Sequence, residues 1–412
     1  MEDKAYKRQV GALVFLLAFV YFTSYISRIN LGAVLVEIIS SGFADCRIAS
    51  LAVVASSVTY GAGQIISGYL GDKCRPQSVI FVGFIITAAM NFGVFFIKES
   101  TLLIPFWAIN GFAQALMWPP MMRIMTKFFS QDEFQSACVK VSYGSASGTI
   151  AVYLFSPVFI SLFGFKSVFA FCGSVALAVG LIWKVWFEKL RRKEWKTDGG
   201  SVVKITDNKN LSSANKAMSI IVLAAIMISV IFQGALRDGI TTWMPSYISE
   251  TFNLDGAVSI LTGVVMPIFA MFSLKLTQIV SSKILKNELV CSGVVFSLTV
   301  VCALILGVFS DKNIALSVFL SAVLIGCMHA VNFVLVCVVP PYFAKQGKVS
   351  LVSGIINSCT YVGSAVSTYA IAIFSADYGW KNTIMLWAAI ALGGAVLCFA
   401  FKNAWKKYIK EA

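Results

Sequence analysis

Charged side chains are scarce in this sequence of 412 residues. Asp, Glu, Lys and Arg together make up 13% of the chain, whereas hydrophobic residues make up 58%. A soluble domain carries roughly 25% charged residues. The mean hydropathy of +0.83 also lies outside the range of a soluble protein. The shortage of charge therefore indicates an integral membrane protein.

The residues and motifs on which most enzymes depend are also missing. His329 is the one histidine, and there is no Walker A loop, no H-E-x-x-H and no dinucleotide-binding glycine pattern. The ten cysteines include no C-x-x-C pair, which disfavours a disulfide framework or a metal site. We therefore expect no enzymatic activity, no cofactor and no metal.

Long apolar runs dominate what is present. About 20 consecutive apolar residues span a bilayer as a helix, and the sequence contains roughly twelve such runs. They cover approximately 10–34, 48–70, 78–97, 101–126, 134–163, 168–187, 218–248, 257–281, 288–309, 314–340, 350–375 and 382–402. The sequence thus predicts an all-α membrane protein with twelve transmembrane helices.

One long polar segment, 188–217, interrupts the apolar runs and divides them six and six. It is charged and poor in large apolar residues, which is typical of a linker. We predict an N-terminal six-helix bundle over 1–187, a cytoplasmic linker over 188–217 and a C-terminal six-helix bundle over 218–412. Two such halves are the signature of repeat-built secondary transporters, whose substrate site lies between them near the middle of the membrane.

Most lysines and arginines outside the apolar runs lie in segments on the same side as the N-terminus. The outer loops hold only Arg47, Lys98, Lys166, Lys312 and Lys381. Since basic residues accumulate in cytoplasmic loops, we expect both termini in the cytoplasm and a multi-pass protein of the inner (plasma) membrane. This asymmetry and anionic lipid explain the net charge of +14, so we expect no nucleic-acid partner. We also expect a monomer.

The first predicted helix of each half contains one arginine far from its ends. Arg28 is about 18 residues into the span 10–34, and Arg237 is about 19 residues into the span 218–248. A charge near the centre of a membrane helix costs about 2.5–3.5 kcal/mol on insertion scales, so each arginine needs compensation. Structural arginines bonded to carbonyls, or to Asp238 in the case of Arg237, are one explanation. The matching depth favours another, a pair that grips an anionic substrate through bidentate hydrogen bonds.

Other polar residues in the apolar runs are candidates for the same site. Tyr21 and Tyr25 precede Arg28 by seven and three positions, so they share its helical face and could donate to substrate oxygens or simply pack between helices. Lys140 could add positive charge or extend to the cytoplasm. His329 could bind substrate, titrate or pack. Asp238 could couple transport to protons or neutralise Arg237.

The segment GYLGDKCRP, residues 68–76, falls at the predicted cytoplasmic turn between spans two and three. Its glycines permit close helix approach, and Asp72, Lys73 and Arg75 could form an inner-gate charge network. The segment resembles the G-x-L-G-D-[RK] loop signature of the major facilitator superfamily.

Within that superfamily, the chain resembles the organophosphate:phosphate antiporters, which include glycerol-3-phosphate and hexose-phosphate transporters. The resemblance is carried over nearly the whole length by YFTSYISRIN (21–30), GFAQALMWPPMMRIMTKFFSQDE (111–133), GALRDGITTWMPSYI (234–248) and VSGIINSCTYVGSAV (352–366). It implies that Arg28 and Arg237 bind phosphate, that Tyr21, Tyr25 and Tyr361 lie near the site, and that Trp118 belongs to it.

The chain also departs from the family pattern. Gly144 stands where members of the glycerol-3-phosphate type carry a histidine, Gln64 where they carry a lysine, Ile29 where a lysine follows the first arginine, and Thr242 where they carry an aspartate. The identity of the substrate is therefore open.

The resulting hypothesis is an exchanger in which a phosphate ester binds between Arg28 and Arg237 and inorganic phosphate returns in its place. One alternative is a proton-coupled symporter of organic anions, in which Asp238 or His329 titrates. The other is a sensor of sugar phosphates, because the resembled family includes transporter-like receptors.

Overall fold

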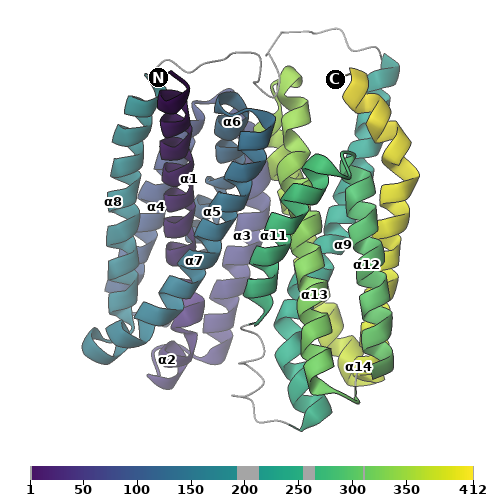
Figure 1. The fold of residues 1–412 in the computed structure, drawn as a ribbon. Helices are drawn as coiled ribbons and strands as arrows, with labels where there is room; N and C mark the ends of the chain where they lie inside the picture. The colour runs from purple at the N-terminus through teal and green to yellow at the C-terminus, as the bar shows by residue number, and fades with distance from the viewer. Residues whose placement is uncertain (1, 193–212, 254–264, 310, 412) are drawn as a thin grey trace. The chain divides into compact units, whose positions relative to one another are not determined.

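The computed structural model describes residues 2–192, 213–253, 265–309 and 311–411. These residues are almost entirely helical, and no strand occurs among them (Figure 1). The predicted all-α class is therefore confirmed.

The chain divides into two compact units. Unit 1 comprises residues 1–205 together with 347–355, and unit 2 comprises 206–346 together with 356–412. The first division falls in the segment predicted as a linker, 188–217, of which residues 193–212 lie outside the described part of the chain. The short piece 347–355 opens the helix α14, so this helix begins in unit 1 and continues in unit 2.

The described residues of unit 1 form eight α-helices and a short 3-10 turn, together with the first residues of α14. They are α1 (Glu2–Ala33), α2 (Leu35–Ser40), α3 (Cys46–Lys73), α4 (Pro76–Phe96), η1 (Ser100–Leu102), α5 (Leu103–Ala115), α6 (Trp118–Phe128), α7 (Gln131–Phe163) and α8 (Lys166–Arg191). The main packing partners are α1 with α7 and α8, α3 with α5, and α4 with α5 and α8.

Local sequence explains where several of these helices begin. The Asp45 carboxylate accepts a hydrogen bond from the backbone N–H of Ile48, which caps α3. Ser130 and Glu133 form a capping box at the start of α7. Pro76 occupies the first position of α4, where its missing N–H costs nothing.

The predicted span 101–126 is broken near its centre. Helix α5 ends at Ala115, and α6 begins at Trp118 with Pro119 and Pro120 in its first turn. Proline has no N–H to donate to the preceding turn and its ring clashes there, so the helix cannot continue unbroken through this point. The break positions Trp118 at the start of a new helix.

Unit 2 contains the remaining helices. They are α9 (Ser213–Phe252), α11 (Val265–Lys283), α12 (Glu288–Phe309), α13 (Ile314–Asn332), the π-helical segment η2 (Phe333–Val338), the 3-10 segment η3 (Pro340–Gln346) and α14 (Val349–Glu411). Helix α13 packs against α9, α11 and α12. Gly379 interrupts α14 with a φ of 76°, a left-handed conformation that suits glycine and separates the predicted spans 350–375 and 382–402.

Eleven helices in the described part of the chain are long and apolar enough to cross a membrane. They correspond to all the predicted spans except 257–281. The first residues of that span, 257–264, lie outside the described residues, and α11 covers the rest.

Candidate functional site

Arg28 is half-buried in unit 1 and lies against a row of aromatic rings. Its guanidinium carbon is 3.6 Å from the ring centroid of Tyr60 on α3 and 5.7 Å from that of Tyr25. The row continues along α1 and α6, since the Tyr25 and Tyr21 rings are 5.1 Å apart and the Tyr21 and Trp118 rings are 5.2 Å apart. Aromatic faces attract a cation, and a guanidinium is a group that binds phosphate and carboxylate through its N–H donors. The structure therefore brings Tyr21, Tyr25 and Trp118 into one row with Arg28.

Buried amides hold the turn of α1 that carries Arg28. The side chains of Asn91 and Asn110 both donate to the backbone carbonyl of Ser27, at 3.4 and 3.1 Å. The amide of Asn30 donates to Asn91 at 2.7 Å. All three asparagines are fully buried. In a membrane, such buried hydrogen bonds fix the packing of one helix on another, here α1 on α4 and α5.

The seam between α1 and α7 leaves no room for side chains at two glycines. A Cβ at Gly144 would clash with the carbonyl oxygen of Ala18, and one at Gly148 would clash with that of Phe22. This packing of α7 on α1 therefore excludes a larger side chain at position 144, including a histidine. Lys140, one turn earlier on α7, is exposed and forms no ion pair with another described residue.

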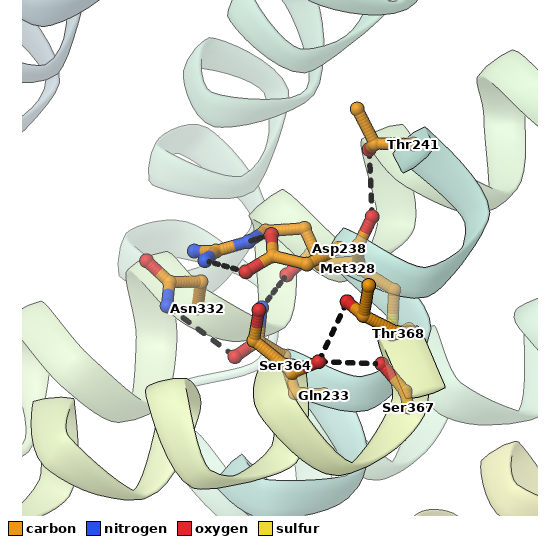
Figure 2. Close-up of polar contacts among 9 residues, drawn as sticks. Gln233, Asp238, Thr241, Met328, Asn332, Ser364, Ser367 and Thr368 are labelled. Atoms are coloured by element: carbon orange, nitrogen blue, oxygen red, sulfur yellow. Dashed lines mark hydrogen bonds and ion pairs between the residues drawn. The ribbon is translucent and has the colours of Figure 1, made fainter. Parts of the chain in front are cut away.

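Unit 2 holds Arg237 in a different environment. Its Nε and Nη2 donate to the two carboxylate oxygens of Asp238, at 2.6 and 2.9 Å (Figure 2). The Arg237 side chain is 16% exposed and that of Asp238 is 27% exposed. Both explanations for this arginine, a structural pair and an anion site, are compatible with this geometry.

Amide groups next to this pair connect α9 to α13. Gln233, one turn before Arg237, donates to the carbonyl of Met328 at 3.1 Å and accepts from Asn332 at 3.4 Å (Figure 2). His329 lies between these two contacts in the chain, is half-buried, and interacts electrostatically with both Arg237 and Asp238. The π-helical segment η2 begins directly after Asn332, and such segments are frequent at functional sites.

Helix α14 contributes hydroxyl groups to the same cluster. Ser364 makes a side-chain contact with Asp238. The hydroxyls of Ser367 and Thr368 donate to the carbonyl of Ser364, at 3.1 and 2.9 Å (Figure 2). Tyr361 is three positions before Ser364 and therefore on the same helical face.

The glycine-rich segment 68–76 forms the last turns of α3 up to Lys73, and the turn to α4 is confined to Cys74 and Arg75. Its contacts differ from the predicted charge network. The Asp72 carboxylate accepts hydrogen bonds from the backbone N–H groups of Ser350 and Leu351, at 3.0 and 2.8 Å, in the first turn of α14. Arg123 of α6 lies 4.0 Å from it and donates to the carbonyls of Gly71 and Cys74. A carboxylate at the positive end of a helix is stabilised by the helix dipole.

Lys73 and Arg75 are exposed and form no ion pair with Asp72 in the described structure. Asp72 is thus the one of the three predicted gate residues that binds another helix. The gate role of all three remains a prediction.

A comparison with protein families identifies this architecture. The model of the major facilitator superfamily matches residues 17–368. The chain belongs to the major facilitator superfamily. Its predicted character as a multi-pass membrane transporter, rather than an enzyme, is thereby confirmed.

Relatives and solved structures of this superfamily agree. A "Probable hexose phosphate transport protein" of Chlamydia trachomatis is 23% identical, with 88% of this chain and 85% of the relative aligned. The glycerol-3-phosphate transporter of Bacillus subtilis is 25% identical over 60% of this chain and 59% of its own. These relatives confirm the resemblance to organophosphate transporters. The proton:xylose symporter XylE has the same fold, with a TM-score of 0.74, 11% identity, and coverage of 97% and 96%.

Sequence reasoning missed many residues of these clusters, among them Tyr60, Arg123 and Asn332. Tyr60 and Arg123 are an ordinary tyrosine and arginine in the helical pattern, and only the packing of α3 and α6 shows what they contact. Asn332 could have been proposed as a site residue, because it follows the one histidine by three positions and so shares its helical face. Within the described residues, no group of His, Cys, Asp or Glu side chains could hold a metal ion.

Proposed function

We propose that this protein is a secondary active transporter that exchanges a phosphate ester for inorganic phosphate by alternating access. The observation that carries the proposal is the pair of membrane-embedded arginines, one in the first long helix of each unit. Arg28 lies against aromatic rings, and Arg237 lies beside Asp238 in a cluster of amide and hydroxyl groups.

The surroundings of Arg28 support this role in unit 1. The rings of Tyr60 and Tyr25 lie over its guanidinium and orient it through cation–π contacts. A cation held in this way in a low-dielectric membrane protein attracts an anion strongly. The planar fork of arginine matches phosphate oxygens.

The relatives narrow the class of anion. One relative is named a probable hexose phosphate transport protein and the other a glycerol-3-phosphate transporter, and both of these compounds are phosphate esters. We extend the phosphate-ester class to this chain. We leave the organic part open, because Gly144 replaces the histidine of the glycerol-3-phosphate type.

Phosphate counterflow in proteoliposomes tests the proposal. Vesicles loaded with unlabelled phosphate should take up labelled phosphate through the intact protein. Arg28→Lys and Arg237→Lys should each reduce this exchange by about tenfold or more, because lysine keeps the charge but loses the bidentate fork. Arg191→Lys is the matched control, since Arg191 pairs with Glu188 at the end of α8, and it should leave exchange unchanged.

Two results would contradict the proposal. Absence of exchange by correctly folded intact protein would refute phosphate antiport. Equal uptake with and without internal phosphate would refute obligatory exchange, and uptake driven by a pH gradient alone would favour a proton-coupled symporter.

A further inference from the structure

Asp238 has a feature that the phosphate-binding role of Arg237 leaves unexplained. Its carboxylate occupies one whole bidentate edge of the guanidinium, through Nε and Nη2. This is the same two-point geometry by which arginine binds a phosphate group. In this structure the carboxylate therefore sits where one edge of a bound phosphate would sit.

The carboxylate cannot move far from Arg237. The two residues are consecutive in α9, so their Cα atoms are about 3.8 Å apart whatever the side chains do. A phosphate that takes the Nε and Nη2 edge has to displace the carboxylate. A phosphate that takes the opposite edge shares the guanidinium with it. In both arrangements the bound anion has a negative charge as its close neighbour.

A displaced carboxylate would still have polar partners. Ser364 of α14 already contacts Asp238, and His329 of α13 interacts electrostatically with it. Displacement therefore leaves the charge close to a hydroxyl and an imidazole, which reduces the cost of releasing it from Arg237.

We propose that Asp238 is a resident anion that competes with substrate for Arg237, so that the site selects singly charged over doubly charged phosphate compounds. The inference rests on the proposed function. Arg237 and Asp238 together carry no net charge, whereas a lone arginine carries one. Arg237 attracts the second negative charge of a dianion and Asp238 repels it by a similar amount, so the pair gives a dianion no electrostatic advantage over a monoanion, while the dianion costs more to remove from water.

Two methyl esters of phosphate share the phosphate group but differ in charge, so they test the effect of charge on binding. At mildly alkaline pH, methyl phosphate carries two negative charges and dimethyl phosphate carries one. The affinity of purified full-length protein for each compound is measured by calorimetry, for the intact chain, for Asp238→Asn and for Asp377→Asn. Asp377 is an exposed acid of α14, so its variant controls for loss of one negative charge from unit 2.

Compared with the intact chain, Asp238→Asn should bind methyl phosphate at least about tenfold more tightly. Its affinity for dimethyl phosphate should be nearly the same as that of the intact chain. Asp377→Asn should match the intact chain for both. An unchanged ratio of the two affinities in Asp238→Asn, or weaker binding of both compounds, overturns the inference. Asp238→Glu, which keeps the charge, should retain the ratio of the intact chain.

The intact protein provides a test that needs no variant to fold. It should bind dimethyl phosphate at least as tightly as methyl phosphate, and a tenfold preference for methyl phosphate overturns the inference. If the intact, folded protein binds neither compound, the proposed function fails and this inference fails with it. If it binds both and the variants leave the ratio unchanged, only the inference fails.

Discussion

Arg28 and Arg237 are held by their neighbours in opposite ways. The Arg28 guanidinium contacts aromatic rings, led by Tyr60 at 3.6 Å, and these contacts orient it. Arg237 has a carboxylate on the next residue and pairs with it. The two arginines are thus alike in position along their helices but different in electrostatics, and substitutions near each should have different effects.

Tyr60 lets us test the aromatic support of Arg28. Tyr60→Phe should bind phosphate as the intact protein does, because the ring face remains. Tyr60→Leu should weaken binding by about 1–2 kcal/mol, the value of a partly desolvated cation–π contact, which corresponds to roughly five- to thirtyfold in Kd. Titration calorimetry with inorganic phosphate measures both. Equal loss in the two variants would show that the hydroxyl matters and not the ring.

Helices α3 and α14 meet at a contact that depends on glycine. A Cβ at Gly68 would lie 2.6 Å from the carbonyl oxygen of Ser350, and one at Gly71 would lie 2.6 Å from its hydroxyl oxygen. The close approach brings the first backbone N–H groups of α14 within reach of Asp72. Glycine at positions 68 and 71 therefore permits the close helix approach that the hydrogen bonds of Asp72 require.

Substitution at Gly68 should disturb this contact. Gly68→Ala should lower stability by about 1–3 kcal/mol, because the obstructing atom is backbone and cannot turn aside. Gly11→Ala in α1 is the matched control, since a Cβ there meets nothing within 4 Å, and it should be neutral or slightly stabilising. Thermal unfolding of the purified proteins compares them. Equal melting temperatures would mean that α14 can shift at no cost.

The sequence predicts elements well where a pattern is long and local. Apolar runs gave the helices, and the span 288–309 coincides with α12. Arg28 and Arg237 could be identified because a charge is conspicuous in an apolar run. Tyr60 and Arg123 could not, since their roles depend on a partner helix tens of residues away. The break of α14 at Gly379 fell between two predicted spans, but a left-handed φ leaves no mark in hydropathy.

At the scale of the whole molecule, the orientation in the membrane remains a prediction from the distribution of basic residues. The chain offers two natural probes of it. Cys46 and Cys74 are exposed at opposite ends of α3, and the other eight cysteines are buried. If both termini are cytoplasmic, α3 begins outside and ends inside.

A membrane-impermeant thiol reagent added to intact cells should then label Cys46 and spare Cys74, and opening the cells should expose Cys74. Cys46→Ser should abolish labelling of intact cells, and Cys74→Ser should not affect it. Labelling of Cys74 in intact cells, with Cys46 protected, would reverse the predicted orientation.

The hydrogen bonds that hold α1 have a consequence for how the protein is made. Ser24, Ser27 and Asn30 bond to partners that follow them by 61 to 145 residues, on α4, α5 and α8. When α1 leaves the ribosome, none of these partners exists yet, and Arg28 adds a charge to the same stretch. Polar groups of this kind oppose insertion of an isolated helix. We therefore expect stable insertion of α1 into the bilayer to depend on helices that are synthesised later. Truncation before Cys172 should leave α1 poorly inserted.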